Sequence, residues 1–175
     1  MITIRVEDAG FGAVLSDLSR ALAAGFPAEM ALAGEILAAG IRANFDQGVG
    51  GTASGNVEAF AALSPRTLRD RRRRSAKGES LKGQQEQALV GFGGQLLCAA
   101  TAHKSGVFGS AYQQSTKGVV VGVDGDTLFY AARAMGLTGG NPVRNPIALR
   151  PETVLPIVEI MRRGVAQKIR AVAGQ

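Results

Sequence analysis

The residues with the most evident chemistry are a run of cations in the middle of the chain. Between residues 66 and 82 there are eight basic side chains and only two acidic ones, Asp70 and Glu79. The basic residues are Arg66, Arg69, Arg71, Arg72, Arg73, Arg74, Lys77 and Lys82. Such a density of positive charge binds phosphate or carboxylate oxygens without sequence preference, and the affinity falls as salt rises. The run predicts contact with DNA or with an acidic partner, and a solvated helix face is the alternative interpretation.

The other reactive residues do not form a recognisable catalytic or metal-binding set. His103 is the only histidine, and neither a ligand spacing nor an orienting acid accompanies it or the nearby Ser105. Cys98 stands among apolar residues and is expected to be a small buried side chain rather than a nucleophile. The segment 122–126 lacks the alternating acids and the closing Glu of a calcium loop and is expected to be a turn. We therefore expect no enzyme activity, no cofactor and no metal.

Composition and charge indicate one domain with an anionic neighbour. The chain has 175 residues, 46% of them hydrophobic and 5% aromatic, which suits a single, mainly aliphatic core. Its 24 glycines exceed the usual share of roughly 7% and predict flexible connections. The net charge of +6 favours an anionic partner. The single cysteine fits a reducing compartment, and we recognise neither a signal peptide nor a membrane-length apolar run. We expect a soluble, cytosolic protein without a membrane partner.

The cations must be positioned by a helix that begins just before them. Ser64 is a suitable N-cap and Pro65 fits a first turn, so a helix is predicted from Ser64 to about Ser75. Upstream, alternation over 2–7 predicts a short strand, and helical periodicity extends over 12–45. Pro27 interrupts this periodicity, which leaves open whether the region is one kinked helix or two. Residues 47–57 are expected to form a loop.

Downstream of the cations, a polar arm over 76–87 and a glycine-weakened helix over 87–103 are expected. The remaining predicted elements are strands at 107–113 and 119–123 with a turn at 115–118, a short helix at 129–135 and a strand at 147–149. A final helix starts at Pro151, with an apolar stripe of Val154, Ile157, Val158, Met161, Val165 and Ile169.

These elements predict an α+β fold. We expect long N-terminal and C-terminal helices packed on a small antiparallel sheet. The chain is predicted to be a single domain over 1–175, with an extended arm or loop at about 46–87.

Several short motifs occur in a fixed order along most of the chain. They are Asn44-Phe45, Gly50-Gly51, Phe60, Leu63-Ser64-Pro65-Arg66-Thr67, Val119-Val120-Val121-Gly122, Tyr130-Ala131, Gly136, Arg144-Asn145-Pro146 and the helix from Pro151. This collinear set resembles the phage virion morphogenesis, or tail completion, family, which includes the Mu-like tail-assembly proteins. The residues that carry the resemblance as family-motif or subunit-interface positions are Phe60, Leu63, Ser64, Thr67, Tyr130, Arg144 and Pro146. Tyr130 and the 144–146 segment also have an interpretation as packing and turn residues.

The resemblance implies a structural role in virion assembly. Proteins of this family look like subunits of a homo-oligomeric ring at the head–tail junction (the neck, with its connector and tail terminator) or at the tail end. The ring, a hexamer by resemblance, would contact other phage neck and tail proteins and surround the DNA passage. Its location would be the virion, after assembly in the host cytoplasm. The alternative function is non-specific nucleic-acid binding through residues 66–82.

Overall fold

The computed structural model describes residues 9–51, 57–60, 62–77, 95–128, 131 and 145–174. The helices are α1 (Ala9–Ala23), α2 (Pro27–Gln47), α3 (Pro65–Ala76), α4 (Gln95–Ala100) and α6 (Pro151–Ala173), and the strands are β1 (Val49–Gly51), β2 (Val57–Ala59), β3 (Gln113–Gln114) and β4 (Val119–Val120). The α+β class is confirmed, with long helices towards both ends of the chain. The predicted strand at 2–7 lies outside the described residues, as does the predicted helix at 129–135 except for Ala131.

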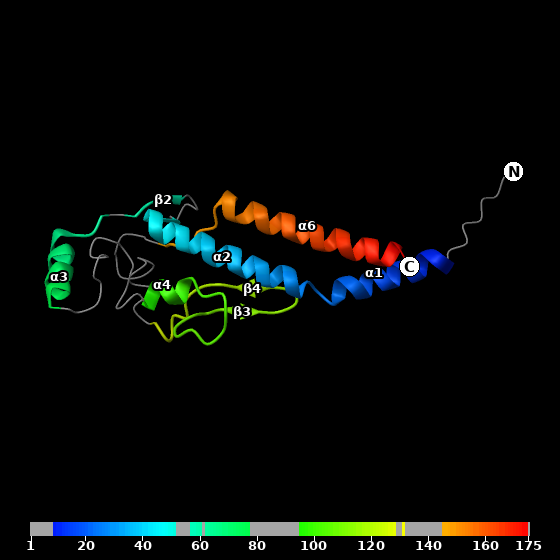
Figure 1. Cartoon of the computed structure of the whole chain (residues 1–175), viewed down its shortest axis with the longest axis horizontal. Coiled ribbons are helices and arrows are strands. Elements are labelled where there is room, and N and C mark those ends of the chain that lie inside the picture. The colour runs from blue at the N-terminus through cyan, green and yellow to red at the C-terminus, as the bar shows by residue number, and fades with distance from the viewer. Residues whose placement is uncertain are drawn as a thin grey trace.

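Helix α2 is the central element of the molecule. Figure 1 shows α6 running back along α2 and α1, while α4 and the β3–β4 hairpin lie on the other side of α2. The antiparallel pair β1–β2 meets the C-terminal end of α2. The small sheet predicted from the sequence is therefore two separate two-stranded hairpins. Helix α3 lies at one end of the molecule, apart from the α2–α6 layers (Figure 1).

The helical region predicted over 12–45 consists of two helices. Gly25 lies between them with a φ of 77°, a left-handed conformation that side-chain-bearing residues rarely adopt. A Cβ at this position would lie 2.3 Å from the carbonyl oxygen of Thr116. The same oxygen accepts a hydrogen bond from the N–H of Phe26 (2.5 Å), and Pro27 then begins α2. The tip of the β3–β4 hairpin thus holds the junction of α1 and α2.

The α1–α2 stretch is apolar as well as long. By length and composition alone, Gly12–Gln47 could cross a membrane, which the sequence pattern had not led us to expect. The stretch carries charges at Asp17, Arg20, Glu29, Glu35, Arg42 and Asp46 and breaks at Gly25. Only 22% of its most apolar window is buried, so many of its apolar side chains face outwards in the single chain.

The core lies where α2 meets α4 and the turn after β4. Its buried side chains are Ile41, Phe45, Leu96, Leu97, Ala99, Ala100, Leu128 and Ala131, with Phe60, Val121, Val123 and Ile147 packed against them. Leu96 and Leu97 of α4 both belong to this core. Cys98 is exposed between them and Ala99, because it projects from the opposite side of this short helix. The prediction that Cys98 is buried is wrong.

The buried side chain of Asn44 accounts for the absence of the strand predicted at 147–149. Asn44 is 1% exposed, and its Nδ2 donates to the carbonyls of Pro146 (2.8 Å) and Ala148 (3.0 Å). These carbonyls bond to a side chain instead of a neighbouring backbone, so 147–149 forms no strand. The prediction of a strand there is wrong.

The hairpin turn at 115–118 is confirmed, whereas its strands are shorter than predicted. The N–H of Ser115 donates to the carbonyl of Gly118 (2.8 Å), and the ladder is extended by an isolated bridge between Ser110 and Val123. Conversely, the loop predicted over 47–57 contains β1 and the first residue of β2. Gly50 makes this possible, because a Cβ there would lie 2.3 Å from the carbonyl oxygen of Asn145.

Helix α6 begins at Pro151 as predicted, yet it packs through small residues. Thr153 and Gly164 are its buried positions, and Gly40 of α2 lies so close that a Cβ would meet the Thr153 side chain at 2.5 Å. Val158 and Ile169, members of the predicted apolar stripe, are 48% and 46% exposed. The apolar stripe of α6 is therefore wider than the part of the helix that packs against the rest of the chain.

Candidate functional site

The start of α3 has the cap that the sequence predicted. Ser64 Oγ accepts a hydrogen bond from the N–H of Thr67 (3.1 Å) and lies 2.8 Å from Thr67 Oγ1. Pro65 occupies the first helical position, where its missing N–H costs no helical bond. The helix then runs to Ala76 and carries six arginines, with Lys77 directly after it. This cap and Pro65 account for where the helix begins.

The cations of α3 fall into two groups. Arg66, Arg69, Arg73 and Lys77 recur at helical spacing on one side, and all four are exposed. We call these four residues the basic stripe. Arg71, Arg72 and Arg74 lie on the other sides of the helix and each makes a contact within the chain. Lys82 lies outside the described residues. The structure thus brings together seven of the eight predicted cations and singles out four of them as one face.

The whole formal net charge of +6 is located in and directly after this helix. Residues 65–77 contain seven of the 20 basic residues and one of the 14 acidic residues. Thirteen basic and thirteen acidic residues remain in the rest of the chain, so that part is formally neutral. An exposed cluster of one sign concentrates counterions and attracts polyanions over several ångströms. The arrangement can bind phosphate or carboxylate groups, and it contains no acid or base positioned for proton transfer within the described residues.

The described family-motif residues lie at two places, the start of α3 and the packing contacts around the core. Ser64 and Thr67 form the cap, and Leu63 before them is half-buried. Phe60 packs against the core, and its N–H donates to the carbonyl of Gly48 (2.6 Å). Pro146 is fully buried beside Asn44. These contacts give Phe60 and Pro146 packing roles. Tyr130 and Arg144 are outside the described part of the chain.

Asn44 is the residue whose role sequence reasoning missed. It was noted as part of a motif and not as a buried hydrogen-bond donor. The signal was present, because a polar side chain stood on the apolar face shared by Ile41 and Phe45. Buried side-chain amides are nearly always hydrogen-bonded, and Asn44 donates to two carbonyls that belong to no strand or helix. Asn44 therefore ties α2 to the segment that leads into α6.

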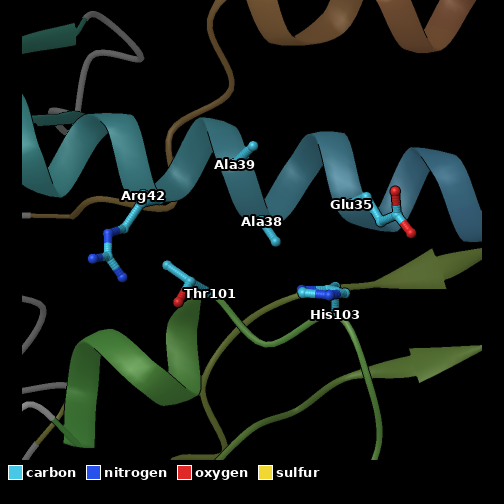
Figure 2. Close-up of a pocket in the computed structure, with 6 residues that line it drawn as sticks. All are labelled: Glu35, Ala38, Ala39, Arg42, Thr101 and His103. Carbon is cyan, nitrogen blue, oxygen red and sulfur yellow. The ribbon is translucent and has the colours of Figure 1, made fainter.

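A hollow of about 400 Å³ lies between α2 and the segment after α4. Figure 2 shows its lining side chains: Glu35, Ala38, Ala39, Arg42, Thr101 and His103. Arg42 forms an exposed ion pair with Asp46 (3.6 Å), and His103 is exposed. No group of three or more His, Cys, Asp or Glu residues suited to a metal occurs in the described ranges. Of the lining side chains, Thr101 donates a hydrogen bond from its Oγ1 to the carbonyl of Leu97 (2.8 Å).

In the turn at 124–127, the carboxylate of Asp124 accepts hydrogen bonds from groups of the same turn. Asp124 Oδ1 accepts from the N–H of Asp126 (3.0 Å), and Asp124 Oδ2 accepts from Thr127 Oγ1 (2.5 Å). The bond from the Thr127 side chain, followed by that from the Asp126 backbone, lowers the pKa of Asp124 below its ordinary value of 3.8. Both oxygens are occupied within the turn, which fits the turn that the sequence predicted.

Comparisons with known proteins found no match. No family model, curated protein or solved structure matches the chain. The functional argument therefore depends on the motifs of the sequence and on the surfaces of the structure.

Proposed function

We propose that the chain is a structural subunit of a tailed-phage neck or tail-completion ring. In this role it acts in virion assembly by oligomerisation and surrounds or lines the passage of the DNA. It is not an enzyme and uses no cofactor. Its partners are further copies of itself, in a hexamer by family resemblance, and the neighbouring neck and tail proteins.

The observation that carries this proposal is the separation of charge from apolar surface. The basic stripe of α3 lies at one end of the molecule, and apolar side chains such as Leu15 and Leu155 are exposed on α1 and α6. A ring around DNA needs both kinds of surface, because apolar contacts join subunits while cations tolerate phosphate without fixing its sequence. The collinear motifs of the sequence resemble a family with this role.

The gene's contribution to particle assembly tests the proposal. We expect deletion to give heads and tails that do not join, or tails of incomplete form, with infectivity restored by a plasmid copy. A plasmid copy with the exposed residue Leu149 changed to Ala should restore infectivity equally well, because it alters neither proposed surface. Normal yields of infectious particles without the gene would show the proposal to be wrong.

Non-specific nucleic-acid binding is the alternative, and the basic stripe favours it. Under this alternative the isolated protein binds duplex DNA strongly at physiological salt and has no place in the mature particle. Under the ring proposal, binding by the isolated subunit is weak, because a single stripe makes few phosphate contacts and affinity depends steeply on their number. Two measurements separate the two functions: the DNA affinity of the isolated monomer, and the presence of the protein in purified particles.

A further inference from the structure

Helix α1 has little buried contact with the rest of its own chain. None of the residues 12–24 is buried, and the element on which α1 packs is α6. Figure 1 shows α1 beyond the N-terminal end of α2, with the last turns of α6 beside it. Because most of the stability of a helix in a protein comes from tertiary packing, α1 is held in place far less firmly than α2, which has seven buried residues.

One side chain of α6 specifies how α1 docks. Lys168 donates from Nζ to the carbonyl of Ala21 (2.7 Å), and its ammonium lies 5.0 Å from the centre of the Phe26 ring. The Ala21 carbonyl belongs to the last turn of α1, and the N–H of Gly25 donates to Leu22 instead of to Ala21. Lys168 is therefore a C-terminal cap of α1 that a different helix supplies.

The docking of α1 on α6 is incomplete in the single chain. A hollow of about 590 Å³ lies between the two helices, and Ala21 and Ala171 are among the residues that line it. Packed helices in protein interiors rarely leave spaces of this size. Since α1 is tied to α2 by a short connection, this connection limits how closely α1 can approach its own α6.

The hinge between α1 and α2 depends on a glycine. It consists of residues 24–26, and Gly25 has a φ of 77°, which side-chain-bearing residues rarely adopt. A Cβ at Gly25 would clash with the backbone of Thr116, so the hairpin tip accepts the closed hinge only when glycine is present. Phe26, the N-cap of α2, makes no capping bond with its side chain. Short hinges of this kind permit an element to exchange between copies.

We infer that α1 is an exchangeable arm, which leaves its own α6 and docks in the same way on α6 of the next copy. The inference rests on the proposed ring function and names a contact that builds the ring. Exchange costs little free energy, because the contacts of α1 with α6 are made again between copies, including the cap of Lys168 on the Ala21 carbonyl. If each copy gives its arm to the next, the contact is head-to-tail and closes into a ring when the rotation between copies permits.

Cross-linking in mixed assemblies tests the exchange on the full-length protein. In a Cys98→Ser background, one preparation carries Ala21→Cys and a second carries Ala171→Cys, since these residues line the same hollow. The two are mixed, allowed to associate and treated with a short bismaleimide. We expect covalent pairs that join one chain of each kind, because α1 of one copy lies on α6 of the other.

Two further preparations complete this experiment. Either cysteine variant alone is the control and should give no linked chains. A chain with both cysteines should give links within single chains when it is diluted to monomer and a ladder of linked chains when it is associated. Associated protein that is linked only within single chains overturns the inference, as does protein that stays monomeric at every concentration used.

A matched pair of glycine variants tests the hinge. Gly25→Ala should lower the dissociation constant for self-association about tenfold, because alanine disfavours the closed hinge and leaves the open one unaffected. Gly12→Ala is the control, since a Cβ at Gly12 meets open space; it changes helix propensity equally in both forms and should leave the constant within about twofold. Sedimentation equilibrium measures the constants, and circular dichroism checks that each variant is folded. Gly25→Ala protein that associates no more tightly than the Gly12→Ala control contradicts the exchange.

The outcome is distinguishable from that of the ring proposal. If the subunit occurs as a ring in particles while cross-links stay within single chains, the function stands and the exchange is wrong. If cross-links join different copies while infectious particles form without the gene, the exchange stands and the virion role is wrong.

Discussion

Helix α3 and the α1–α6 side of the molecule are opposite in character. Residues 65–77 hold seven cations and a single acid, whereas α1 and α6 expose Leu15, Leu22 and Leu155 in a part of the chain that is formally neutral. Charge on α3 attracts anions at a distance and weakens with salt, whereas apolar faces bind by contact and are nearly insensitive to salt. Under the proposed ring function, this difference would separate subunit assembly from contact with a polyanion by placing them on different helices.

The largest expected effect concerns the core, which belongs to the α2–α4 side and not to α3. Leu96 is 0% exposed, so Leu96→Ala should lower the free energy of unfolding by about 4 kcal/mol through lost burial and a cavity. Urea denaturation measures the loss. Leu149→Ala is the matched control, since Leu149 is 57% exposed and should change stability by less than about 0.5 kcal/mol. Equal effects at both positions would contradict the assigned core.

The second prediction tests whether the position of the cations or the total net charge governs DNA binding. Changing Arg66, Arg69, Arg73 and Lys77 to Gln should weaken duplex DNA binding at physiological salt roughly 10²–10³-fold and reduce the salt slope by about three to four. The control changes four exposed cations elsewhere, Arg20, Arg42, Lys117 and Arg163, to Gln.

Both quadruple variants lose four of the six net charges, so they carry the same net charge. Fluorescence anisotropy with labelled duplex over a salt series measures the affinities. Similar losses in the two variants would show that net charge, and not the basic stripe, governs binding.

The third prediction concerns the cap that holds α3. Ser64→Ala removes the oxygen that accepts from the N–H of Thr67, which should destabilise the helix by about 1 kcal/mol. Ser64→Asp keeps an acceptor and should retain the helix. Hydrogen exchange of the α3 amides reports the change, and the amides of α2 serve as the internal reference. Unchanged protection of α3 in Ser64→Ala would contradict a role for the cap.

The smallest effect is expected at the turn of 124–127. The lowered pKa of Asp124 means that the folded turn favours the charged carboxylate. Its contribution is therefore fully present above the unfolded-state pKa and is lost as the pH falls through the lowered folded-state value. Titration followed by NMR should show the Thr127 signals and the N–H signal of Asp126 shifting in this acidic range. An Asp124 pKa at or above the ordinary value would contradict the hydrogen bonds described.

Local signals allowed much of the fold to be predicted. Ser64 and Pro65 define the start of α3, Pro151 that of α6, and the polar turn after Gln114 the hairpin, because capping and turn chemistry act within a few residues. Long-range contacts were not accessible in the same way. The bond from Asn44 to the Pro146 carbonyl spans 102 residues and removes a predicted strand.

The residues of the candidate site were predicted better than their arrangement in space. Charge density located the cations, but only the helix places Arg66, Arg69, Arg73 and Lys77 on one face. The sequence did not show that these apolar surfaces are exposed. An apolar stripe predicts burial, but it does not tell whether the same chain or another one buries it. Ile169, expected among the apolar stripe of α6, is an example at 46% exposed.

The most direct test of the central claim is a reconstruction of the phage particle by electron cryo-microscopy. The account predicts a closed ring of this subunit at the neck or tail end, with α3 directed towards the DNA passage and α1 and α6 between adjacent copies. A particle without the subunit, or a ring in which α3 points outwards to solvent, would contradict it.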